Sequence, residues 1–128
     1  GEGRPHRDGG PAILTFSPTG LELSHIYYQH GIITCDNAPA VEIINLEGLY
    51  HEKVWIKDGR RHREHGPAEI TTDLITGVEF AVTWWSNDKK HREDGAAVIT
   101  RDRDTNEINA KFWYINGIPP PNTQNLDL

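Results

Sequence analysis

The stretch His-Arg-Glu-His-Gly-Pro-Ala at residues 62–68 decides the fold, because versions of it recur along the chain. The motif reads His-Arg-Glu-Asp-Gly-Ala-Ala at 91–97, His-Arg-Asp-Gly-Gly-Pro-Ala at 6–12 and Thr-Cys-Asp-Asn-Ala-Pro-Ala at 34–40. Successive closing alanines are 28, 28 and 29 residues apart. A fixed period of this length is typical of a tandem repeat, and here it predicts four units.

Turn-forming residues keep the same phase. One column consists of Gly20, Gly48, Gly77 and Asn106, and Asn is the usual substitute for Gly where the backbone needs a positive φ. We therefore predict one shared turn conformation with positive φ at these four positions. A second column holds Asp-Gly at 58–59, Asn-Asp at 87–88 and Asn-Gly at 116–117. Such dipeptides favour tight type I′ turns.

Each unit is predicted to form two strands, and no stretch has the apolar spacing of a helix. We predict an all-β meander of about four tandem β-hairpin repeats of 28–29 residues, stacked into one extended sheet or solenoid. Residues 1–121 would form a single domain, followed by a loosely ordered tail at 122–128. The expected strands are 12–16, 21–29, 40–44, 49–57, 68–72, 78–86, 97–101 and 107–115.

Aromatic residues also recur in columns. Tyr27, Trp55, Trp84 and Trp113 share one position, and Trp85 belongs to the next. A small domain needs its few aromatic residues in its core, so a buried ladder between units is expected. The alternative is that Trp84 and Trp85 form an exposed aromatic platform that binds a partner.

The phrase Trp-Tyr-Ile-Asn-Gly at 113–117, together with the motifs at 62–68 and 91–97, resembles a known repeat. That repeat has the form W-Y-x-N-G-x-x-H-R-x-D-G-P-A and occurs in many phage and giant-virus proteins. Its layout is similar to that of the MORN repeat, which also builds stacked β-hairpins. The resemblance covers essentially the whole chain. It implies a viral source and a scaffold or interaction role, and it implies no reaction.

Composition excludes several classes of protein. The 128 residues include 13 Lys and Arg against 19 Asp and Glu, a net charge of −6, so binding to nucleic acid in general is not expected. No apolar run approaches the roughly 18 residues that a membrane-spanning helix needs. Cys35 has no second cysteine to pair with, which favours a reducing compartment and a cytoplasmic location, the host cytoplasm for a viral protein.

Seven histidines raise the question of a metal site. His6, His62 and His91 share one repeat position, and equivalent positions in stacked hairpins are roughly 9–10 Å apart. Zinc holds its ligand atoms at about 2.0–2.3 Å, so neighbours in the column are too far apart to share an ion. We expect no metal and no cofactor. Each histidine should pack on an aromatic ring or hydrogen-bond a turn carbonyl.

Carboxylates fill a neighbouring column made of Asp8, Asp36, Glu64 and Glu93. These side chains are expected to accept turn N–H groups or to pair with the adjacent arginines. General acid–base catalysis needs two unlike carboxylates at a defined separation, which a regular column does not supply. Nucleophile and phosphate-binding motifs are missing. We therefore predict no catalytic residue and no enzymatic activity.

Basic residues crowd the connections between units and would form a stripe along one edge. Such a stripe could bind a phosphate, a nucleotide or an acidic protein surface, unless the neighbouring carboxylates neutralise it. The candidate binding residues are Arg7, Arg60, Arg61, His62, Arg63, Lys89, Lys90, His91 and Arg92.

Three functions remain open from the sequence. The leading hypothesis is a non-enzymatic, virus-encoded interaction module that acts on a host or defence protein in the cytoplasm. The second is a binding module for a small anionic ligand such as a nucleotide. The third is a virion or structural repeat protein that relies on end-to-end stacking.

Overall fold

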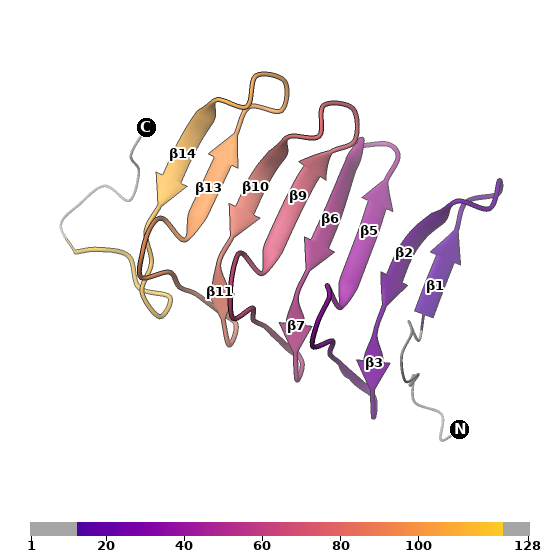
Figure 1. Cartoon of the computed structure of the whole chain (residues 1–128), viewed down its shortest axis with the longest axis horizontal. Coiled ribbons are helices and arrows are strands. Elements are labelled where there is room, and N and C mark those ends of the chain that lie inside the picture. The colour runs from indigo at the N-terminus through magenta and orange to yellow at the C-terminus, as the bar shows by residue number, and fades with distance from the viewer. Residues whose placement is uncertain (1–12, 122–128) are drawn as a thin grey trace.

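The computed structural model describes residues 13–121, and every regular element in that range is a β-strand (Figure 1). Eight of these strands form the main sheet, an antiparallel meander in which neighbours in the sequence are neighbours in space. The all-β prediction is confirmed for the described range; Arg7 and the predicted tail at 122–128 lie outside it. In sheet order the strands are β1 (Ile13–Phe16), β2 (Glu22–Ile26), β5 (Val41–Asn45), β6 (Tyr50–Val54), β9 (Glu69–Asp73), β10 (Glu79–Thr83), β13 (Val98–Arg101) and β14 (Ile108–Phe112).

Three small hairpins, the side hairpins, extend from one end of the main sheet within residues 13–121 (Figure 1). The prediction of unbroken second strands was wrong, because the strand expected at 49–57 breaks at Trp55 and the others break at equivalent positions. Each type I′ turn pairs the chain with its own next residues and so draws it out of the main sheet. The side hairpins are β3 (Tyr28–Gln29) with β4 (Ile32–Ile33), β7 (Ile56–Lys57) with β8 (Arg60–Arg61) and β11 (Trp85–Ser86) with β12 (Lys89–Lys90).

The predicted type I′ turns are confirmed by their backbone angles. Asp58 and Gly59 have φ of 52° and 79°, and Asn116 and Gly117 have φ of 49° and 80°. Two consecutive residues with positive φ define this turn. Asn, Asp and Gly adopt that conformation at low cost, which explains why they fill this column.

The shared positive φ predicted for the glycine column is confirmed at Gly20, Gly77 and Asn106 and is wrong at Gly48. In that turn Leu49 takes the left-handed conformation instead, with φ of 56°. Glycine is required at position 48 for steric reasons, because an added Cβ would lie 2.6 Å from Cε2 of the Tyr50 ring.

Alanines hold the junction between the main sheet and the side hairpins. Ala68 is fully buried, accepts a hydrogen bond from the Trp55 N–H at 2.7 Å and donates one to the Thr83 carbonyl at 2.9 Å. Ala97 is equally buried and bridges Trp84 and Phe112 in the same way. A larger side chain would have to fit where three chain segments converge, which explains why the motif closes on alanine.

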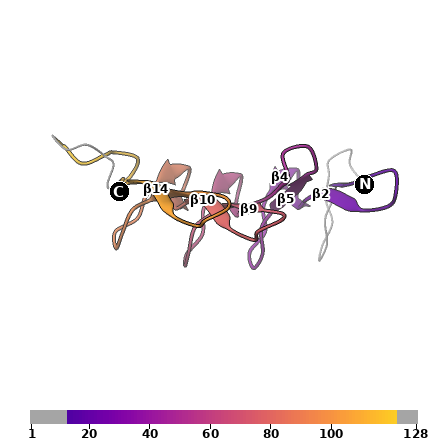
Figure 2. The same ribbon diagram turned by 90° about the horizontal axis from the view of Figure 1, so that it is seen from above.

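The main sheet is a single layer. Figure 2 shows the main sheet edge-on, and within residues 13–121 no second sheet or helix packs over either of its faces. In the described range no large side chain is fully buried, and the buried apolar residues are Ala40, Val54, Ala68, Ile70, Val82, Ala96 and Ala97. Stability therefore comes from contacts between neighbouring strands and hairpins rather than from a closed core.

Candidate functional site

The side-hairpin end of the sheet contains most of the predicted site residues, and the histidines join neighbouring hairpins there. Nδ1 of His62 accepts the N–H of Asn87 at 3.3 Å, and Nδ1 of His91 accepts the N–H of Asn116 at 2.9 Å. Thr34 occupies the same repeat position, and its Oγ1 accepts the N–H of Asp58 at 3.2 Å. For these two histidines the expected hydrogen bond to a turn carbonyl was wrong, because each ring accepts a turn amide instead.

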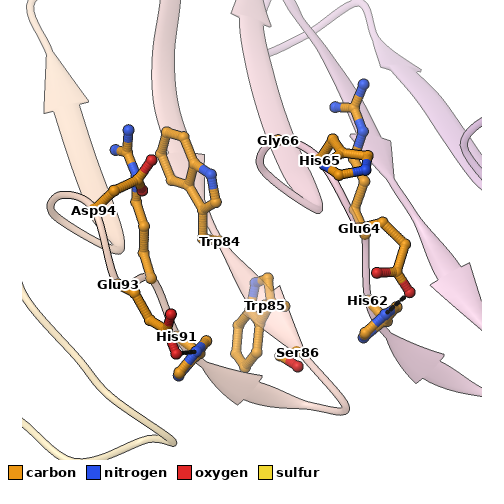
Figure 3. Close-up of a pocket in the computed structure, with 12 residues that line it drawn as sticks. His62, Glu64, His65, Gly66, Trp84, Trp85, Ser86, His91, Glu93 and Asp94 are labelled. Carbon is orange, nitrogen blue, oxygen red and sulfur yellow. Dashed lines mark hydrogen bonds and ion pairs between the residues drawn. The ribbon is translucent and has the colours of Figure 1, made fainter.

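In the acidic column, Glu64 and Glu93 pair with these histidines, whereas the sequence predicted bonds to turn N–H groups or to the adjacent arginines; Asp8 lies outside the described residues. Nε2 of His62 lies 3.1 Å from Glu64, and Nε2 of His91 lies 3.6 Å from Glu93 (Figure 3). Because Nδ1 accepts a hydrogen bond, it carries no proton of its own, and the ring proton is on Nε2, facing the carboxylate. The hydrogen bond from His62 lowers the pKa of Glu64. Both carboxylates remain largely exposed to solvent.

The guanidinium groups of Arg63 and Arg92 lie over tryptophan rings. The guanidinium carbon of Arg63 is 3.9 Å from the ring centroid of Trp55, and that of Arg92 is 3.8 Å from Trp84. Each Nη1 also donates to a backbone carbonyl, that of Pro67 or that of Ala96, at 3.0 Å. Stacking and hydrogen bonding together tie these two cations to the protein itself.

The motif glycine makes room for the stacked arginine. A Cβ on Gly95 would lie 2.8 Å from the guanidinium carbon of Arg92. A Cβ on Gly66 would lie 3.2 Å from that of Arg63, and φ at Gly66 is 121°, where side chains are strained. Arginine and glycine in the motif therefore form one structural device.

A second group of cations surrounds Trp85. The Arg61 guanidinium carbon lies 3.9 Å from the Trp85 centroid, and Nζ of Lys90 lies 5.9 Å from Trp85 and 5.2 Å from Tyr114. Nε1 of Trp85 donates to Glu69 at 3.1 Å. The predicted platform residues Trp84 and Trp85 are thus half-buried beneath cations.

Arg61 also holds the turn of the next side hairpin. Its N–H donates to Oδ1 of Asp88 at 2.8 Å, and its Nε lies 3.3 Å from the same oxygen. The backbone hydrogen bond, followed by that from the Arg61 side chain, lowers the pKa of Asp88. Arg60 and Lys89 remain exposed at the tips of their hairpins. The predicted basic stripe is therefore divided between engaged and exposed cations.

A groove separates neighbouring side hairpins, with a volume of about 720 Å³ (Figure 3). Trp84, Trp85 and Ser86 form one wall, and the two histidine–glutamate pairs lie at its sides. Within residues 13–121, no group of three or more His, Cys, Asp or Glu side chains could hold a metal ion. The groove offers aromatic and polar contacts for a ligand.

A second groove, of about 480 Å³, lies at the C-terminal end of the described chain and is mostly apolar. Trp113 and Tyr114 line it together with Ile115, Ile118 and the proline run at 119–121. The proline run follows the bridge between Ile115 and Ile118. Its apolar lining distinguishes it from the groove between the side hairpins.

Sequence reasoning missed a cluster at the opposite end of the sheet, where Arg103 joins three turns. Nε of Arg103 lies 2.8 Å from Oδ2 of Asp73, and Nη2 donates to the carbonyls of Gly48 and Leu49 at 2.9 and 2.8 Å. Its guanidinium carbon is 4.4 Å from the Phe80 centroid. The available signal was its position, because the equivalent places in the two preceding turns hold leucine.

Asp73 is the buried carboxylate of this cluster, only 7% exposed. Its Oδ1 accepts the N–H groups of Ile75 and Thr76 at 2.8 and 2.9 Å. These backbone hydrogen bonds, and then Arg103, lower the pKa of Asp73 to about 2. The turn end of the sheet is therefore held in a defined conformation.

Next to this cluster lies a group of exposed apolar side chains, the apolar turn patch. It consists of Leu46, Leu49, Leu74 and Ile75, which are 50%, 42%, 39% and 75% exposed. The two turns that carry them are joined by a hydrogen bond from the Leu74 N–H to the Leu49 carbonyl at 3.0 Å. Grouped, exposed apolar side chains of this kind mark interaction surfaces.

No protein-family model, curated protein or solved structure matches the chain. Among residues 13–121, no helix is long and apolar enough to cross a membrane.

Proposed function

We propose that this protein is a non-enzymatic interaction module built from four tandem hairpin units, and that it binds another protein through the apolar turn patch. The module belongs in the cytoplasm, in keeping with its lone Cys35. On the resemblance of its repeats to those of phage and giant-virus proteins, the partner is a host or defence protein.

One observation carries this proposal: Leu46, Leu49, Leu74 and Ile75 are exposed together on two turns that Arg103 holds in place. Apolar side chains on a preorganised surface bind a protein without the cost of ordering a loop. Arg103 spans from Asp73 to the carbonyls of the preceding turn, so the patch keeps its shape before a partner arrives.

Binding of a small anion by the basic residues has weaker support. Arg63 and Arg92 already stack on tryptophans and donate to carbonyls, and Arg61 already pairs with Asp88. A phosphate would have to compete with these contacts. The exposed cations Arg60 and Lys89 sit on different side hairpins.

The test begins with site-specific photocrosslinking from position 75 of the whole chain in host cells, which identifies the protein in contact with that position. That partner is then purified on its own, without crosslinking, and its affinity for this protein is measured by calorimetry. Replacing Leu74 and Ile75 by serine should weaken that binding by about tenfold or more, as expected for central apolar contacts. The matched control is Ile118→Ser, at a residue that is 68% exposed but lies at the other end of the sheet. Equal affinity for the Leu74→Ser/Ile75→Ser variant and the wild type would refute the proposal.

A second comparison separates the anion hypothesis from the protein-binding one. The double variant Arg63→Ala/Arg92→Ala should lower the melting temperature, because it removes two stacked, hydrogen-bonded side chains, and should leave partner affinity unchanged. If the melting temperature stays constant while binding of a nucleotide or of the partner is lost, the basic stripe is the binding surface.

A further inference from the structure

The internal joints of the main sheet all follow one register. Where one hairpin meets the next, Ile26 faces Val41, Val54 faces Glu69 and Thr83 faces Val98. In every joint, the residue before the aromatic position faces the residue after the motif alanine. The chain therefore contains three copies of a single hairpin-to-hairpin interface.

The outermost strands carry the two halves of this same interface. Within residues 13–121, β1 and β14 each pair with a main-sheet neighbour on one side only. β1 begins with Ile13, the residue after the motif alanine, and β14 ends with Phe112, the residue before the aromatic position. The two strands also run in opposite directions (Figure 1), as an antiparallel joint requires.

The edge strand β1 exposes apolar side chains. All four residues of β1 are exposed, including Ile13 at 37%, Leu14 at 39% and Phe16 at 57%. Neither β1 nor β14 contains a proline, and the proline run at 119–121 comes after β14 has ended. An exposed apolar edge of this kind is a template for a further strand.

We propose that a second copy of this chain docks head to tail, with its β1 paired antiparallel to β14 in the internal register. Phe112 would then face Ile13 of the second copy, Lys111 would face Leu14 and Ala110 would face Thr15. The occupant is a second copy because both halves of the interface are present on one chain. This self-association goes beyond the proposed function and uses strand edges remote from the apolar turn patch.

A head-to-tail joint of this kind does not close. Each added copy presents a new free β14 or β1, so association continues into short open chains whose length rises with concentration. The joint forms between separate molecules and carries the cost of lost rotation and translation, so it is weaker than its internal counterparts.

Charge substitution at one facing pair tests the register. With the full 128-residue chain, Leu14→Lys places like charges at the Leu14–Lys111 pair and should weaken association about two- to fivefold in sedimentation experiments. Leu14→Glu creates an opposite-charge pair and should strengthen it. The double variant Leu14→Lys/Lys111→Glu should restore association, and circular dichroism of dilute samples checks that each variant is folded.

Three outcomes would overturn the proposal. The chain could sediment as a monomer at every concentration. Both Leu14 variants could weaken association equally, which would point to symmetric pairing of two β1 strands. The strength of association could also be the same for the wild type and both Leu14 variants, which would place the contact elsewhere. None of these results bears on partner binding by the apolar turn patch, so the two proposals fail independently.

Discussion

At the residue scale, a threonine hydroxyl and two histidine rings accept the same kind of hydrogen bond between neighbouring hairpins. Thr34, His62 and His91 each accept the backbone N–H of a turn residue in the next hairpin. This hydrogen bond needs only an acceptor at the right reach. Residues 34–40 therefore depart from the motif in sequence while keeping its hydrogen bond.

This equivalence predicts the behaviour of substitutions at His91. His91→Ala leaves the Asn116 N–H without its acceptor and should reduce the free energy of unfolding by about 1 kcal/mol. His91→Thr supplies the hydroxyl that Thr34 uses, so it should recover a large part of that loss. Urea denaturation of the two variants and the wild type measures both effects, and equal losses for Ala and Thr would contradict the shared role.

The contacts of Arg63 and Arg92 with tryptophans could not be predicted from the sequence around these two arginines. The basic residues around Arg63 and Arg92 are visible in the sequence as a stripe. Their charge suggests a ligand, but the tryptophan that each one covers lies eight residues earlier. Only the paths of the side hairpins bring the two together. The motif glycine was a usable signal, since it marks a close approach by another group.

At the element scale, turn length and bulges account for the unequal repeat lengths. The β1–β2 hairpin combines a three-residue turn at 18–20 with a bulge at Leu23. The β5–β6 hairpin has a four-residue turn at 46–49 and no bulge. The β9–β10 hairpin has a four-residue turn and a bulge at Phe80, which makes it one residue longer. This compensation also moves the left-handed residue from Gly48 to Leu49.

The turn cluster of Asp73 predicts a dependence of stability on pH. The folded pKa is about 2 against an ordinary value of 3.8. A carboxylate whose pKa is lowered by folding stabilises the protein at pH values above its ordinary pKa. This contribution is lost as the pH falls from about 4 through 2. The melting temperature of the wild type should therefore fall across this window. Asp73→Asn should start lower at neutral pH and fall less.

Asp102 provides a matched control for this measurement. Its pKa is also lowered by backbone N–H groups, those of Thr105 and Asp104, and no arginine is among the causes. Asp102→Asn should flatten the dependence of melting temperature on pH less than Asp73→Asn does, because only Asp73 pairs with Arg103. The difference between the two variants therefore measures the contribution of Arg103. Identical profiles for the two variants would show that Arg103 contributes nothing.

The sequence predicts the period, the strands and the type I′ turns of this fold because each depends on local chemistry. It misses the break at Trp55, since a strand that changes partners has the same composition as one that does not. It also misses the Arg103–Asp73 pair, whose members are 30 residues apart. Contacts between turns of different hairpins depend on the register of the strands that separate them.

At the scale of the whole molecule, a single-layer sheet lacks the shared core that makes most domains cooperative. Apart from Arg103, which reaches from the β13–β14 turn to the β5–β6 turn, the hairpins pair with their neighbours in the sheet, so stability is largely a sum of local terms. Strands in the middle of the sheet have neighbours on both sides and include the buried Val54 and Ile70. β1 is exposed along its whole length.

This arrangement predicts a gradient of amide hydrogen exchange across the sheet. Amides of β9 should exchange only through extensive unfolding, whereas those of β1 should exchange through local opening, at least about tenfold faster. Nuclear magnetic resonance of a dilute sample measures both strands in one experiment, and equal protection would mean that the sheet unfolds as one unit.

Raising the protein concentration adds a second measurement. Head-to-tail docking should slow exchange at the β1 amides on its outer edge and leave β9 unchanged, because the new joint covers only the edge of the sheet.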